Sequence, residues 1–163
     1  MRFLTLYSPR WLFLYPGLAL ILIGIVVSAW LLPGPRAIGR ITLDINTLTY
    51  AAFLILAGFQ AVIFAIFSKV FAITEGLLPQ DDQIEWLLKQ ITLERGLMLS
   101  SLLIITGLGS SLAAIAYWSS RQFGPIDPSF SMRLVIPGII LFALGLQVLF
   151  SGFFMSILLL KRK

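Results

Sequence analysis

Four long runs of apolar residues constrain the fold of this 163-residue chain more than any other feature. They cover residues 11–32, 48–68, 96–118 and 134–160, and none contains an acidic or basic side chain. About 20 apolar residues are enough to cross a membrane as a helix. Hydrophobic residues make up 59% of the chain and charged residues only 12%, against about 25% charged in soluble domains. We therefore expect an all-α integral membrane protein, with four transmembrane helices in a single domain spanning residues 1–163.

The connection between the second and third runs has a pattern of its own. Ile84, Leu87, Leu88 and Ile91 recur at helical spacing, with charged residues on the other faces. This pattern predicts an amphipathic helix over residues 82–94 that lies in the membrane interface. Packing against a soluble partner domain is an equally good explanation.

Basic residues are distributed unevenly between the two sides of such a bundle. Four spans place both termini and the middle connection on one side, together with eight of the 12 Lys and Arg residues. Arg36, Arg40, Arg121 and Arg133 fall on the other side. Because cytoplasmic loops carry the Lys/Arg excess, we expect a multi-pass protein with both termini cytoplasmic.

A weak internal repeat relates the two halves of the chain. The segment that starts Gly58-Phe59-Gln60 resembles the one that starts Gly145-Leu146-Gln147, at an offset of 87. The Gly-Pro pairs at 34 and 124 lie 90 apart, and the Gly-Leu pairs at 17 and 96 lie 79 apart. This pattern indicates two tandem helical hairpins, related by a parallel repeat about the membrane normal. Chance similarity between apolar helices is the competing explanation.

Few residues could carry chemistry. The chain has no Cys and no His, and its spans hold no ionisable residue, which disfavours a proton-coupled transporter. No nucleotide-binding or metal motif is present, because Asp81-Asp82 is not a D-x-D motif, so we assign no catalytic residue and no metal ligand. Gln60 and Gln147 are the polar residues of interest within the spans, and we expect them to hydrogen-bond to each other between the second and fourth helices. Contact with a ligand is the alternative role for these two amides.

Basic residues at the expected cytoplasmic boundary are candidate ligands for lipid headgroups. They are Arg10, Arg95, Lys161 and Arg162. Such residues commonly anchor helices to anionic lipids. Binding a polyprenyl-phosphate is the more specific role that they could have.

Several segments resemble the C-terminal membrane region of bacterial family 2 glycosyltransferases similar to dolichol-phosphate-mannose synthase. The most specific is the run from Ser8 to Gly17, SPRWLFLYPG. Further matching segments are residues 43–48, 58–60, 92–97 and 132–137. Proteins of this family carry a GT-A catalytic domain with a D-x-D metal motif ahead of these helices. The resemblance therefore implies that this chain is the membrane half alone, as a fragment or the product of a split gene, and that any divalent metal belongs to the catalytic domain.

The resemblance implies a protein of the bacterial inner (plasma) membrane with a role in the cell envelope. We expect a membrane anchor that presents a polyprenyl-phosphate acceptor to a glycosyltransferase domain and is non-catalytic alone, so whether the chain counts as an enzyme is left open. A small four-helix flippase for lipid-linked sugars, similar to GtrA, and a membrane assembly subunit are the alternatives. Expected partners are membrane lipids, a cytoplasmic GT-A domain or transferase subunit, and other copies of this chain, but no nucleic acid.

Overall fold

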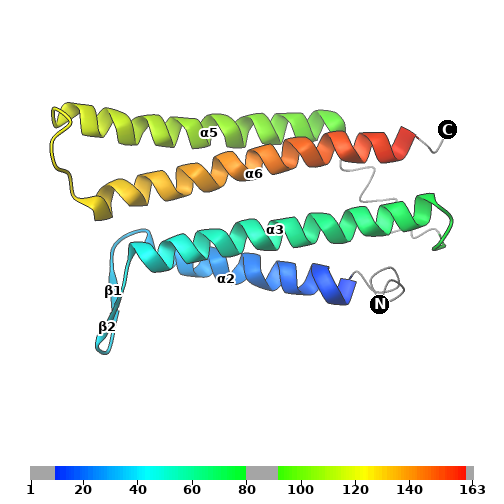
Figure 1. The fold of residues 1–163 in the computed structure, drawn as a ribbon, viewed down its shortest axis with the longest axis horizontal. Coiled ribbons are helices and arrows are strands. Elements are labelled where there is room, and N and C mark those ends of the chain that lie inside the picture. Colours follow the sequence, from blue (N-terminus) through cyan, green and yellow to red (C-terminus); the bar gives the residue numbers. More distant parts are fainter. Residues whose placement is uncertain (1–9, 80–91, 161–163) are drawn as a thin grey trace.

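The computed structural model describes residues 10–79 and 92–160, which form four long helices and one short β-hairpin (Figure 1). The elements are η1 (Arg10–Leu14, a π-helical turn), α2 (Tyr15–Leu31), β1 (Arg36–Ile38), β2 (Ile41–Leu43), α3 (Ile45–Thr74), α5 (Leu93–Ser120) and α6 (Pro128–Leu160). Each of the four helical segments is long and apolar enough to cross a membrane. The predicted all-α membrane fold is confirmed.

The helices extend beyond the apolar runs that predict them. α3 begins at Ile45 and ends at Thr74, so Lys69 lies inside the helix, and α6 begins at Pro128, before Arg133. Helices continue past the hydrocarbon because their backbone hydrogen bonds are satisfied internally at any depth. Most of the predicted interfacial helix over residues 82–94 lies outside the described residues, and its last two positions belong to the first turn of α5.

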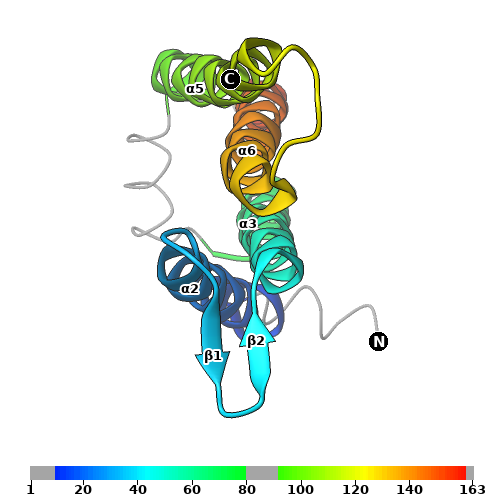
Figure 2. The same ribbon diagram turned by 90° about the vertical axis from the view of Figure 1, so that its left-hand side faces the viewer.

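Each pair of consecutive helices forms an antiparallel hairpin. α2 packs on α3 and α5 packs on α6, while α3 and α6 lie side by side in the middle (Figures 1 and 2). Seen along the helices, the order across the molecule is α5, α6, α3 and α2 (Figure 2). The predicted arrangement of two tandem hairpins is confirmed.

Glycines allow the helices of each hairpin to approach closely. A Cβ added to Gly58 of α3 would lie 2.5 Å from the carbonyl oxygen of Gly17 in α2. A Cβ added to Gly107 of α5 would lie 2.6 Å from the carbonyl oxygen of Gly138 in α6. No side chain fits at these distances, so both hairpins are held by backbone-to-backbone packing, as is common between small residues in membranes.

The contacts of the two hairpins correspond residue by residue. Gly58 packs against Gly17 and Ile21, and Gly145 packs against Ser100 and Ile104. Residue 58 thus corresponds to residue 145, which confirms the offset of 87 between the second helices of the hairpins. Residue 17 corresponds to residue 100, so the first helices are offset by 83, and the predicted match of Gly17 with Gly96 is wrong.

The segment between α2 and α3 is a β-hairpin, which the sequence pattern does not predict. β1 pairs with β2 in antiparallel register, with Arg36 opposite Leu43 and Ile38 opposite Ile41. The two-residue turn begins at Gly39, whose φ of +60° suits the first central position of a type II′ turn. The hairpin extends away from the helices, roughly across their direction (Figure 1). The prolines at 33 and 35 mark the end of the helix but give no signal for this short strand pair.

An ion pair and an apolar cluster join the two hairpins at this end of the molecule. Arg133 of α6 pairs with Asp44, the residue before α3, and its Nε also donates to the carbonyl oxygen of Leu31 at 3.4 Å. Ser129 donates its hydroxyl to the second oxygen of Asp44 at 3.2 Å. The cluster beneath contains Leu31, Leu48, Ala52, Ile136 and Ile140. The α2–α3 and α5–α6 hairpins are therefore fixed to each other by α3 and α6.

Candidate functional site

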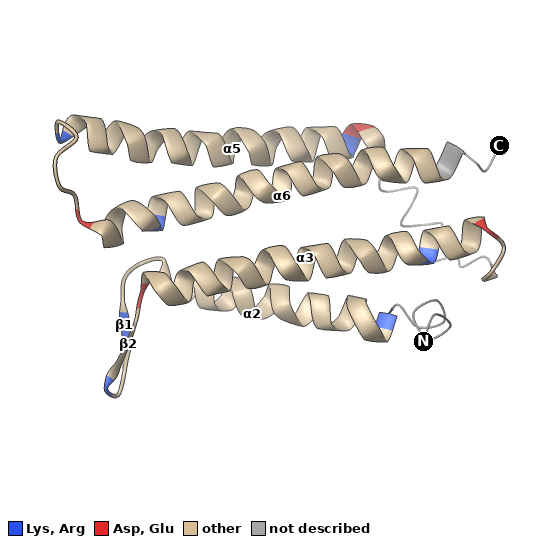
Figure 3. Cartoon of the chain, viewed as in Figure 1, with Lys and Arg blue, Asp and Glu red and all other residues tan. Residues whose placement is uncertain are grey.

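Charged residues lie at the two ends of the bundle, and the long middle section has none among the described residues (Figure 3). The start of η1, the last turns of α3 and the start of α5 bring Arg10, Lys69, Glu75, Glu94 and Arg95 to one end. The other end holds the charges of the β-hairpin, the α5–α6 loop and the first turns of α6. Charged ends on either side of an uncharged middle section are the pattern expected of helices that cross the hydrocarbon.

A cavity of about 280 Å³ lies between α3, α5 and α6, in the half of the bundle nearest Arg95. Its walls are Phe59, Ile63, Ile66, Phe67, Gly96, Leu99, Val148, Gly152 and Met155, and its polar lining residues are Arg95 and Ser151. Along α3 the lining runs from residue 59 to residue 67, which is roughly 12 Å of helix. The site thus combines a long apolar wall with one cation.

The beginning of α5 positions Arg95 at this cavity. Thr92 caps the helix, because its hydroxyl oxygen accepts from the backbone N–H of Arg95 at 3.4 Å. Helix formation from Leu93 onward then places Arg95 in the first turn, near the membrane surface. Its side chain is exposed.

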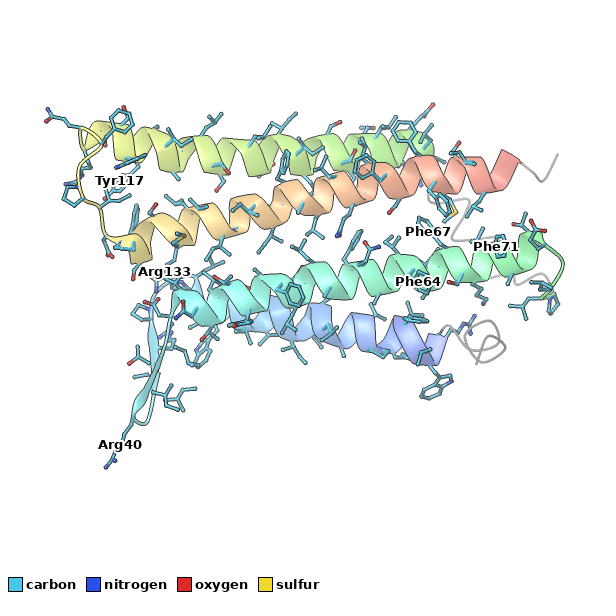
Figure 4. All side chains as sticks on the ribbon, in the orientation of Figure 1. Arg40, Phe64, Phe67, Phe71, Tyr117 and Arg133 are labelled. Atoms are coloured by element: carbon cyan, nitrogen blue, oxygen red, sulfur yellow. The ribbon has the colours of Figure 1, made fainter. Side chains whose placement is uncertain are left out.

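Two glycines leave room for the cavity. A Cβ added to Gly96 would meet nothing within 4 Å, and one added to Gly152 would meet only Leu93, at 3.8 Å. These glycines therefore differ from Gly58 and Gly107, which are required for close packing. Phe67 of α3 (Figure 4), which lines the cavity, packs on Phe154 of α6 with 4.8 Å between the ring centroids.

The chemistry of this site suits an amphipathic lipid with an anionic head. A guanidinium binds phosphate oxygens through several N–H donors. Aliphatic and aromatic walls favour a hydrocarbon chain, because the chain exchanges contact with water or bulk lipid for contact with a surface that fits it. Among the described residues no group of three or more Asp, Glu, His or Cys residues is placed to hold a metal ion.

The structure brings together only part of the predicted headgroup set. Arg10 is exposed at the start of η1, at the same end of the bundle as Arg95. Lys161 and Arg162 lie outside the described residues. Of the four basic candidates, Arg95 alone lines the cavity within the described part of the chain.

The predicted hydrogen bond between Gln60 and Gln147 is not formed in the described structure. The Oε1 of Gln147 is buried and has no hydrogen-bond partner. Gln60 is exposed, on a face of α3 that carries the exposed residues Phe53 and Phe64. The two residues are equivalent in the repeat, but the helix faces that carry them are packed differently, which sequence similarity could not reveal.

Sequence reasoning missed the Asp44–Arg133 pair. Asp44 belongs to one of the matching segments and Arg133 to the charge count, and neither observation links the two residues. The sequence did carry a signal for this pair. Asp44 precedes the second span and Arg133 precedes the fourth, so two opposite charges lie on the same side of the predicted membrane. The pair joins the hairpins at the opposite end of the bundle and is not part of the cavity lining.

Four apolar spans, close glycine packing and an apolar cavity define a membrane-embedded module of two helical hairpins. The family model for the glycosyltransferase family 2 C-terminal transmembrane region matches residues 66–159, more than half of the chain. The chain belongs to this family. The resemblance carried by the short motifs is confirmed.

A curated relative supports the same assignment over nearly the whole chain. The chain is 28% identical over 158 residues to the low-salt glycan biosynthesis hexosyltransferase Agl6 of Haloferax volcanii. The match covers 95% of this chain and 36% of the relative, so the chain spans about a third of the length of that protein. No solved structure matches the chain.

Proposed function

We propose that this membrane module binds the polyprenyl-phosphate acceptor of a family 2 glycosyltransferase and presents it to a catalytic domain at the membrane surface. The observation that carries the proposal is the cavity between α3, α5 and α6, which has an apolar wall and Arg95 in its lining. The phosphate would pair with Arg95, and the first isoprene units would lie against Phe59, Ile63 and Leu99. Arg10, at the same end, would contact neighbouring anionic lipid.

The module's second task in this proposal is anchoring. A catalytic domain held at the end that bears Arg10 and Arg95 would meet the phosphate at the depth where the apolar spans stop. Family membership supports this role, since the matched region is the membrane part of glycosyltransferases. The acceptor and not the sugar donor is the substrate that such a site could recognise, because the cavity walls are almost wholly apolar.

Binding of a polyprenyl-phosphate probe tests the proposal. The full chain in nanodiscs of zwitterionic lipid should be labelled by a photoactivatable short-chain polyprenyl-phosphate, and Arg95→Gln should reduce labelling about tenfold, since a charge-assisted contact contributes about 1.5–3 kcal/mol. Arg95→Lys should retain part of it. The matched control is Arg121→Gln, which removes a cation at the opposite end of α5.

Two results would contradict the acceptor role. Equal labelling of the Arg95→Gln variant and the unchanged chain would show that Arg95 does not bind the phosphate. Equal labelling by a polyprenyl alcohol would show that the cavity takes hydrocarbon without recognising the anionic head. A tryptic map of the labelled protein should place the adduct on the cavity walls of α3 or α6.

A further inference from the structure

The contact between the two hairpins uses different faces of α3 and α6. Ala52 and Val70 of α3 are buried in the two clusters that join α3 to α6. Their equivalents at the offset of 87 are Ile139 and Ile157 of α6, whose exposed fractions are 55% and 63%. The face of α3 that packs against α6 therefore corresponds, in the repeat, to a face of α6 that is exposed.

The face of α6 that packs against α3 shows the same relation in reverse. Ile140 of α6 is buried against α3, whereas its equivalent on α3, Phe53, is 63% exposed. Ser151 lines the cavity beside α3, whereas its equivalent, Phe64, is 49% exposed and packs edge-to-face on Phe13 of η1. The interface between the hairpins is thus heterologous, and each of its two halves has a copy on the outside of the molecule that the contact between the hairpins leaves unused.

Gln60 lies in the middle of the unused face of α3. It is exposed, near the centre of a 30-residue membrane helix, and has no side-chain hydrogen bond within the described part of the chain. Leaving an amide in hydrocarbon without a partner is costly, whereas contact with a second helix provides polar groups and shields it from lipid. A purely lipid-facing surface would not need this residue.

We propose that a second copy of this chain docks here and repeats the internal contact. The open face of α3 in one copy, with Phe53, Gln60 and Phe64, would pack against the open face of α6 in the next, with Ile139 and Ile157. The internal register places Phe53 of one copy beside Ile139 of the other. Copies joined in this way associate head to tail, and a closed ring forms when the rotation between them allows it.

Cysteine cross-linking tests this arrangement against a clean background, since the chain contains no Cys. Phe53→Cys and Ile139→Cys chains carrying different tags are co-expressed, and the membranes are treated with a disulfide-forming oxidant. The mixed sample should give a cross-linked dimer with both tags. Each variant alone should give at least tenfold less dimer, because in a head-to-tail contact neither residue meets its own copy.

A lipid-facing residue outside the proposed interface supplies the control. Leu112 of α5 is 63% exposed, like Phe53, and Leu112→Cys co-expressed with Ile139→Cys should give no more dimer than either variant alone. Equal yields of dimer from this pair and the Phe53–Ile139 pair would mean that the cross-links arise from random collision, and would overturn the proposal. Efficient cross-linking of Phe53→Cys with itself would overturn it as well, because it would mean a two-fold contact.

The role of Gln60 is measured in the same assay. Adding Gln60→Leu to the Phe53→Cys chain should lower the yield of mixed dimer about fivefold, the effect expected for one interhelical amide contact. Circular dichroism of the purified variant checks that its helices remain formed. An unchanged yield with intact helices would contradict a role for Gln60 in the contact between copies.

Discussion

At the scale of single residues, the pair formed by Asp44 and Arg133 joins the two hairpins to each other. Arg133 is only 15% exposed and Asp44 33% exposed. The guanidinium also donates to the carbonyl oxygen of Leu31, so it reaches the end of α2, the start of α3 and its own helix. An uncompensated charge at this partly buried position costs more than the pair contributes when intact.

Asp44→Asn and Arg133→Gln should each lower the free energy of unfolding in detergent by about 1–2 kcal/mol. The double variant should lose less than the sum of the two, because neither charge is then left without its partner. Titration with a denaturing detergent, followed by circular dichroism, measures these differences. Arg121→Gln is the control, since Arg121 contacts the Tyr117 ring at 5.6 Å and joins no two helices; strict additivity would argue against a coupled pair.

At the scale of elements, glycine positions decide which helices can meet. Gly107 and Gly109 are two residues apart on α5, yet only a Cβ at Gly107 would strike the backbone of α6. A hydroxyl on the same helix supports the contact, since Ser110 donates to the carbonyl oxygen of Leu134 at 2.8 Å. That carbonyl lies in the turn disturbed by Pro137, whose missing N–H and ring weaken the local helix bonds.

Gly107→Ala should separate α5 from α6 and cost about 1–3 kcal/mol, as overpacking does in tight interfaces. Gly109→Ala should change stability by no more than about 1 kcal/mol, in the stabilising direction, because the added methyl faces open space and alanine favours helix. Thermal unfolding of both variants in one detergent checks the contrast. Equal losses at the two positions would mean that packing against α6 does not depend on this glycine.

At the scale of the whole molecule, the ends of the bundle differ in charge and in what they carry. One end has the cavity with Arg95 and the start of η1, and the other has the β-hairpin with Arg36 and Arg40 (Figures 3 and 4). Over the whole sequence, eight of the 12 Lys and Arg residues belong to the segments at the cavity end and four to those at the β-hairpin end. The Lys/Arg excess follows the cytoplasmic side in multi-pass proteins. We therefore expect the end with the cavity to face the cytoplasm.

Reporter fusions check this orientation. A reporter that is active only in the cytoplasm should be active when fused after the last residue. A reporter that is active only after export should be active when inserted in the turn between β1 and β2. Replacing Arg10 and Arg95 with Gln should weaken the preference, because the charge bias that sets orientation falls. The reverse labelling pattern in the unchanged chain would refute the predicted topology and would place the cavity on the wrong side for the proposed acceptor.

Sequence alone predicted the number of membrane helices, the tandem hairpins and the family. Hydrocarbon demands long uncharged helices, and the family resemblance is carried by short motifs that can be recognised without the tertiary structure. Arg95 was also a sequence-based candidate, although only as one of four basic residues at the boundary. Tertiary structure decided which faces meet. It separated Gln60 from Gln147, joined Asp44 to Arg133 and opened a cavity beside Gly96 and Gly152. The physical reason is that an apolar helix looks nearly the same on every side in sequence, whereas packing depends on the rotation of each helix and on a few glycines.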